Sequence, residues 1–125
     1  MKDSASHLHL ICEDFKRTLD FYKSEMPFFK KRLEEISSKN TGEDILKQVE
    51  HFENTFIAMN ENLDVLLHDV NLKQDAMLKD AKAKPDFINL KVIATADDLK
   101  TLIDFTTKEF ATTKENFYRF LSDHL

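Results

Sequence analysis

Apolar residues recur at alternating steps of three and four positions through three long segments of this chain, and the whole sequence contains one glycine, Gly42. Side chains at these steps lie on one face of an α-helix, and a helix with one apolar face buries it against another apolar surface. The pattern therefore predicts long amphipathic helices that pack together. In the first segment the repeat consists of Leu8, Cys12, Phe15, Leu19, Tyr22, Met26, Phe29, Leu33 and Ile36.

Pro27 lies inside this first repeat, where a proline removes a backbone donor and bends or ends a helix. Because the apolar repeat keeps its phase on both sides of Pro27, we expect one kinked helix from about Ser6 to Ser38 rather than two separate helices. The polar residues from Ser37 to Gly42 then form a turn.

Two more repeats follow this turn, and between them lies a segment whose phase is unclear. The second repeat ends before Pro85, and the third predicts a helix that starts near Ala96, with Thr95 as its N-cap. The intervening apolar stretch, 86–94, fits either a short fourth helical element or an irregular linker. The second repeat consists of Ile45, Val49, Phe52, Phe56, Met59, Leu63, Leu66, Val70 and Met77, and the third of Leu99, Ile103, Thr106, Phe110, Thr113, Phe117 and Phe120.

The length of the chain, 125 residues, fits one domain spanning residues 1–125, and a content of 42% hydrophobic and 33% charged residues is typical of a globular protein. Short turns between long helices make neighbours in the sequence antiparallel. We therefore expect an all-α fold, an up-down-up antiparallel bundle of three long helices.

Charge and composition argue against several classes of partner. A formal net charge of -5 disfavours nucleic acid, which binds clustered cations, and the apolar runs are too short for a membrane span. The first residues lack the apolar stretch of a secretory signal, and the single cysteine, Cys12, lies on the apolar repeat. We therefore expect a cytoplasmic protein that binds neither nucleic acid nor membrane.

The scarcity of glycine also limits the chemistry that this chain can perform. Phosphate-binding loops, dinucleotide fingerprints and nucleophile elbows need glycine for tight turns or a close backbone approach, and Gly42 alone cannot build them. The sequence thus predicts a protein without cofactor and without enzymatic activity.

A metal site is the alternative that the sequence leaves open, because helical bundles often hold metals between inward-facing histidines and carboxylates. His9 and Glu13 lie one helical turn apart, and folding the first helix back on the second brings them near the level of His68. These three residues are the candidate ligands. His68 falls on the outer side of the second helix, however, which favours solvated side chains.

Three polar residues fall on predicted core positions near one level of the bundle, namely Tyr22, Asn60 and Thr106. Buried hydroxyl and amide groups need hydrogen-bond partners. We interpret these residues as a hydrogen-bonded layer that sets the register of the helices, and a small ligand pocket is the alternative.

A second set of apolar residues lies outside the three main repeats, and it comprises Phe21, Phe28, Val65, Leu72 and Phe105. A contiguous exposed apolar patch marks an interface in many proteins, although wide core faces or coverage by residues 86–94 would also explain these side chains. The sequence therefore predicts a protein–protein interaction module that binds a protein partner or itself, as a homodimer.

Overall fold

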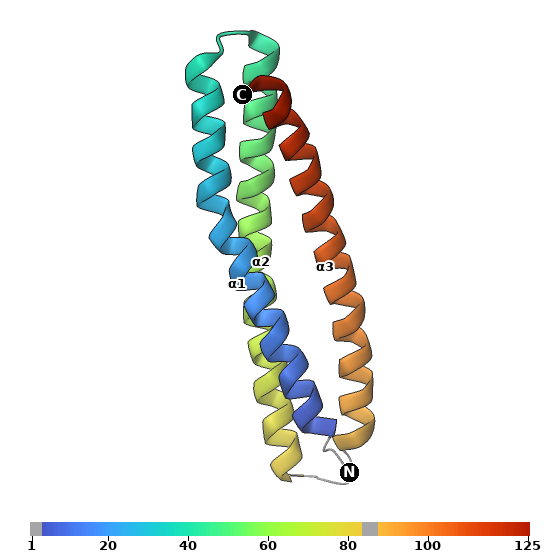
Figure 1. Ribbon diagram of the computed structural model, residues 1–125. Coiled ribbons are helices and arrows are strands. Elements are labelled where there is room, and N and C mark those ends of the chain that lie inside the picture. The colour runs from blue at the N-terminus through green and yellow to red at the C-terminus, as the bar shows by residue number, and fades with distance from the viewer. Residues whose placement is uncertain (1–3, 84–87) are drawn as a thin grey trace.

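Three α-helices make up the fold: α1 (Ser4–Lys39), α2 (Glu43–Ala83) and α3 (Ile88–His124). The computed structural model describes residues 4–83 and 88–125, with the side chains of residues 6–79 and 95–125, and no strand occurs in these ranges. The chain runs up in α1, down in α2 and up again in α3 (Figure 1), so the predicted all-α up-down-up bundle is confirmed. None of the described helices contains a stretch both long and apolar enough to cross a membrane.

Pro27 lies inside α1 without ending it, so the predicted continuous first helix is confirmed. Proline has no backbone N–H, and the carbonyl of Lys23 therefore lacks its usual donor one turn later. Nearby, the Ser24 hydroxyl donates a hydrogen bond of 2.6 Å to the carbonyl of Phe21. The axis of α1 changes direction along its length (Figure 1), which lets both of its halves follow the other helices.

Residues 86–94 do not form a separate fourth helix. The helix α3 begins at Ile88, so residues 88–94 are its first turns, and residues 86 and 87 lie outside the described ranges. The sequence from Ile88 to Leu99 contains neither proline nor glycine, and nothing in it interrupts a helix. Thr95 therefore lies within α3, and the prediction that it caps the helix was wrong.

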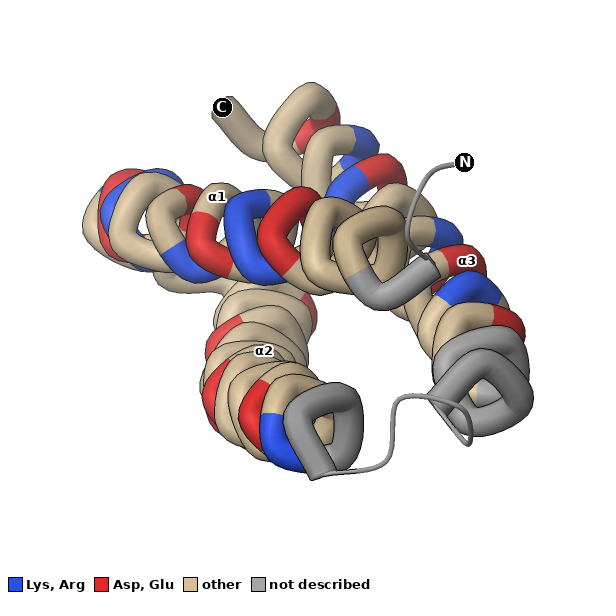
Figure 2. The backbone as a smooth tube through the Cα atoms, turned by 90° about the horizontal axis from the view of Figure 1, so that it is seen from below, with Lys and Arg blue, Asp and Glu red and all other residues tan. Residues whose placement is uncertain are grey.

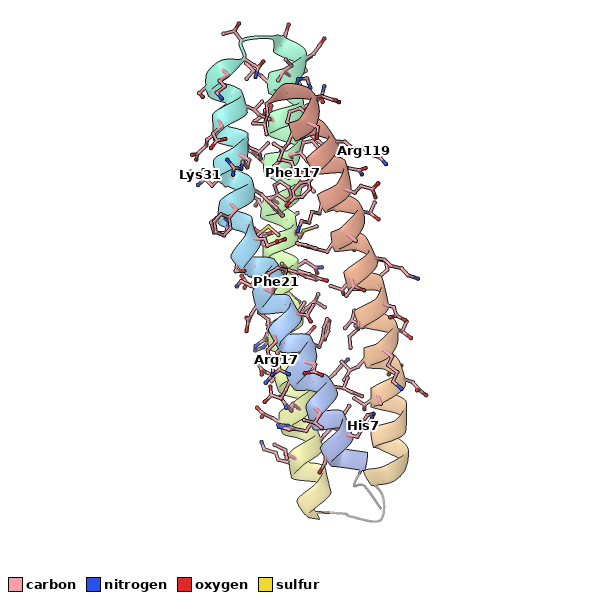
Figure 3. The ribbon with its side chains drawn as sticks, viewed as in Figure 1. His7, Arg17, Phe21, Lys31, Phe117 and Arg119 are labelled. Carbon is pink, nitrogen blue, oxygen red and sulfur yellow. The ribbon has the colours of Figure 1, made fainter. Side chains whose placement is uncertain are left out.

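The core consists of two apolar clusters stacked along the bundle, with Tyr22, Met26 and Met59 touching both. Aromatic rings dominate the upper cluster, where the fully buried Phe117 lies 5.2 Å from the ring of Phe29 and 4.9 Å from that of Phe56. Figure 3 shows Phe117 between the helices, whereas Arg119 points away from them. The buried members are Leu8, Cys12, Phe15, Leu19, Leu63, Leu66, Val70 and Leu99 in the lower cluster, and Phe29, Leu33, Ile36, Val49, Phe56, Phe110, Phe117, Phe120 and Leu121 in the upper one.

The helix α1 is the central element of the bundle. It packs against both α2 and α3, and these two helices contact each other least. Viewed from below (Figure 2), α1 lies across α2 and α3, which stand apart on the side away from it. The bundle therefore has one well-packed side under α1 and a more open side between α2 and α3.

We expect the substitution Phe117→Ala to lower the free energy of unfolding by about 3–5 kcal/mol, because it removes a fully buried ring from the aromatic cluster. The adjacent Tyr118 is 48% exposed, so Tyr118→Ala should cost less than about 1 kcal/mol. Urea unfolding followed by circular dichroism measures both values. Equal losses in the two variants would contradict the observed packing.

Candidate functional site

The five apolar residues that the sequence predicts for an interface all lie outside the core. Their side chains are 54% to 69% exposed, with Phe28 the most exposed of the set, and the set consists of Phe21, Phe28, Val65, Leu72 and Phe105. Single exposed apolar residues are common on protein surfaces. What distinguishes these residues is therefore their position relative to one another.

The five residues lie on three different faces of the bundle. Val65 and Leu72 each follow a buried residue, Leu63 and Val70, by two positions, which places them a little more than half a turn from the core, on the outer side of α2. Phe105 lies on α3, and Phe21 and Phe28 lie on α1.

Phe105 and the two α1 phenylalanines do not share a face. Lys114 of α3 contacts Glu25 of α1, so Lys114 marks the side of α3 that adjoins α1. Phe105 precedes Lys114 by nine residues, about two and a half turns, and therefore lies on the opposite side of α3. Phe105, Val65 and Leu72 therefore cannot belong to one surface with Phe21 and Phe28.

A groove between α1 and α3, called here the α1–α3 groove, lies beside Phe28 near the C-terminal end of α3. Its volume is about 480 Å³, and it is lined by Glu25, Phe28, Phe29, Arg32, Tyr118, Leu121, Ser122 and Leu125. The buried side chains of Phe29 and Leu121 lie at its base, while Phe28, Tyr118 and Leu125 are exposed at its edges. The groove thus combines apolar side chains from both sides with three polar ones, Glu25, Arg32 and Ser122.

Sequence reasoning missed Tyr118 and Leu125. These residues lie seven positions apart, with Tyr118 on α3 and Leu125 directly after its last residue, so the spacing that links Phe21 and Phe28 on α1 was available as a signal. The adjacent Phe117 belongs to the predicted core repeat, and Leu121, outside that repeat, is also buried in the core.

Charged groups of both signs lie around the α1–α3 groove, and one ion pair, between Glu25 and Lys114, joins its two helices. Lys114 donates to both carboxylate oxygens of Glu25, at 3.0 and 3.1 Å, and this pairing raises the pKa of Lys114 above its ordinary value. The Lys114 Nζ atom also lies 5.3 Å from the centroid of the Tyr118 ring. Arg32 forms an ion pair with Glu35 at 3.1 Å.

The three residues of the predicted polar layer do not form the hydrogen-bonded layer that we expected. The Tyr22 ring is half-buried and stacks on Phe110 with centroids 3.8 Å apart, and burial raises the pKa of its hydroxyl. Thr106 is buried and Asn60 is half-buried. No hydrogen bond joins these three residues in the part of the chain that the structure describes, so it is the aromatic stack that connects α1 with α3 at this level.

Two of the three candidate metal ligands, His9 and Glu13, lie in a cluster of polar side chains between α1 and α2 that has a lysine at its centre. The Lys16 Nζ atom lies 2.9 Å from Glu13, 2.8 Å from the Oε1 atom of Gln74 and 3.1 Å from Asn71, so three acceptors surround one ammonium group. His9 is 3.7 Å from Glu13 through Nε2 and 2.6 Å from Gln74 through Nδ1.

The cation at the centre of this cluster is the ammonium group of Lys16, in the place where a metal site would hold a metal ion. His68 is exposed on α2, and the described side chains include no group of three or more His, Cys, Asp or Glu that could hold a metal. Sequence reasoning missed the central roles of Lys16 and Gln74. The available signal was a polar residue, Gln74, between Val70 and Met77 in the apolar repeat of α2.

The fold and these surfaces are the basis for a functional proposal, because comparisons with known proteins found no match. No protein-family model matches the sequence, and neither the curated proteins nor the solved structures contain a match to it.

We expect Lys16→Met to lower the free energy of unfolding by about 1–2 kcal/mol, because the buried Gln74 loses its donor. Arg17→Met is the matched control, since among the described side chains Arg17 pairs with the exposed Asp14 of its own helix, and it should cost less than about 0.5 kcal/mol. Urea denaturation measures both variants.

The hydrogen bond from Lys16 lowers the pKa of Glu13, so this interaction stabilises the fold above the ordinary pKa of a glutamate and is lost as the pH falls through the lowered value. In Lys16→Met the pKa of Glu13, followed by NMR of its carboxyl carbon, should rise. An unchanged pKa would exclude the contact between Lys16 and Glu13.

Proposed function

We propose that this protein is a non-enzymatic, cytoplasmic protein–protein interaction module that self-associates through the α1–α3 groove. The observation that carries the proposal is the apolar surface formed by Phe28, Tyr118 and Leu125, which are 69%, 48% and 63% exposed around the groove. Large exposed aromatic side chains beside a hollow are typical of the anchor residues that dominate protein interfaces.

A second copy of the chain is the partner that this surface suits best. In a two-fold symmetric contact the same surface meets itself, so one face must carry both projecting groups and a hollow that receives them. The α1–α3 groove has both features side by side, because Phe28 and Leu125 line its exposed edges and the groove itself provides about 480 Å³. Phe28 of each copy would then enter the groove of the other.

The charges around the groove also favour self-association. This face carries Glu25, Arg32 and Lys114, and farther along α1 the ion pair between Arg17 and Asp14 lies next to Phe21. A face with both signs can oppose unlike charges in a symmetric dimer, whereas a face of one sign repels its own copy. The outer side of α2 carries charge of one sign, since residues 48–72 contain acids but neither lysine nor arginine.

Two further features support a binding role rather than a catalytic one, and a location in the cytoplasm. The ionisable groups around the groove are engaged in structural contacts, Glu25 with Lys114 and Arg32 with Glu35. Cys12 is a buried free thiol whose pKa is raised by burial, which suits a reducing compartment and an unreactive core position.

Sedimentation analysis tests the proposal. We expect the wild-type protein to form dimers at high micromolar concentration, and Phe28→Asp to weaken the dimer at least about tenfold, because a carboxylate would be placed in the apolar contact. The matched control is Leu72→Asp, which introduces the same carboxylate at an exposed leucine on the outer side of α2 and should leave dimerisation unchanged.

Both substituted residues are more than half exposed, so circular dichroism should show the same helix content in all three proteins. A wild-type protein that stays monomeric at these concentrations would rule out self-association. Equal weakening in both variants would rule out the α1–α3 groove as the contact.

A further inference from the structure

A second depression lies between α2 and α3, on the side of the bundle where these helices stand apart (Figure 2). We call it the α2–α3 hollow. Its volume is about 320 Å³, which is within the range of small-molecule sites. The described residues that line it are Thr55, Ala58, Met59, Asn62, Leu63, Thr106, Glu109, Phe110 and Thr113.

The hollow is short, and apolar residues lie beyond both of its ends. Its lining covers residues 55–63 of α2 and 106–113 of α3, which corresponds to a length of about 12 Å. Beyond its upper end the Phe52 ring lies 5.3 Å from Phe117 and 5.1 Å from Phe120, which joins the two helices. At its lower end Leu66 and Leu99 are buried in one cluster. A site of this length suits a small molecule better than a helix.

Thr106, which lines this hollow, has a solvent-accessible hydroxyl group without a hydrogen-bond partner among the described residues. Thr106 is 7% exposed, and its side chain forms no hydrogen bond with any residue in 6–79 or 95–125. Two neighbouring threonines behave differently: Thr55 donates to the carbonyl of His51 at 2.8 Å, and Thr107 donates to that of Ile103 at 2.9 Å. The hydroxyl of Thr106 is thus available to a molecule in the hollow, where it can donate or accept a hydrogen bond.

The rest of the lining defines the chemistry of such a molecule. The apolar walls are formed by Met59, Leu63 and Phe110, and the Phe110 ring also stacks on Tyr22. Glu109 is the one ionisable residue of the described lining, and it forms no ion pair with the side chains that the structure describes. A ligand that combines an apolar body with a positively charged, hydrogen-bonding head would match both parts.

We propose that the α2–α3 hollow binds a small primary amine with an apolar body, whose ammonium group contacts Glu109 and Thr106 while the body packs against Met59 and Phe110. The site is separate from the α1–α3 groove, so this inference does not depend on self-association. An aromatic amine of the size of 2-phenylethylamine fits the volume and the charge.

Titration of isotope-labelled protein with 2-phenylethylamine, followed by NMR, tests the site. We expect saturable shifts of the Thr106, Thr113 and Met59 methyl signals, and binding at least about fivefold tighter than that of 2-phenylethanol, which has the same body without the charge. The anion 3-phenylpropanoate should bind more weakly than the alcohol. The absence of saturable shifts at millimolar amine would overturn the proposal.

Three variants separate a real site from non-specific attraction to an acidic protein. Glu109→Gln should remove the preference for the amine over the alcohol, and Thr106→Val should weaken the binding of both, since valine has the shape of threonine without the hydroxyl. Ala58→Phe should fill the hollow and abolish binding, and Ala58 is exposed, so the fold tolerates the change. Glu61→Gln, an exposed carboxylate on the outer side of α2, is the control and should change nothing.

Equal effects of Glu109→Gln and Glu61→Gln would mean that the amine responds only to net charge, and the proposed site would be wrong. The same conclusion would follow if Ala58→Phe bound the amine like the wild type, or if the shifts mapped to residues outside the hollow. Sedimentation of the NMR sample tests whether a second copy occupies the hollow instead, which would show as a dimer that Ala58→Phe disrupts and Phe28→Asp does not.

Discussion

The burial of the apolar face of α1 is the interaction on which the rest of this structure depends. Residues from Leu8 to Ile36 present one continuous stripe, and α2 and α3 both pack against it while touching each other far less. Since apolar burial is the main favourable term in folding, α1 holds the bundle together and positions its two neighbours. The axis of α1 bends along its length (Figure 1), and buried residues of this stripe occur on both sides of Pro27.

This unequal packing explains why the two sides of α3 differ. On the side towards α1, the stack of Tyr22 on Phe110 and the ion pair of Glu25 with Lys114 join the two helices, and the α1–α3 groove lies near the C-terminal end of α3. On the side towards α2, aromatic rings of the two helices meet above, and leucines of both helices belong to one buried cluster below. The hollow that contains Thr106 lies between these two contacts.

Much of the fold, and part of the candidate site, could be predicted from the pattern of residues. The unbroken phase across Pro27 indicated one long first helix, and the positions of Phe21 and Phe28 outside the main stripe indicated exposure. The cluster around Lys16 could not be predicted in the same way. Its acceptors, Asn71 and Gln74, come from another helix, and a pattern along one helix does not say which side chains meet across an interface.

The sequence by itself determined the helices and the direction in which each residue points from its own helix axis, because helical periodicity is a local property of the backbone. Only the tertiary structure decided which outward residues share a face, since that depends on how each helix is rotated and tilted against its neighbours. Phe28 thus came to lie beside Tyr118 and Leu125, Phe105 turned to the opposite side of α3, and the hydroxyl of Thr106 came to line a hollow instead of joining a core layer.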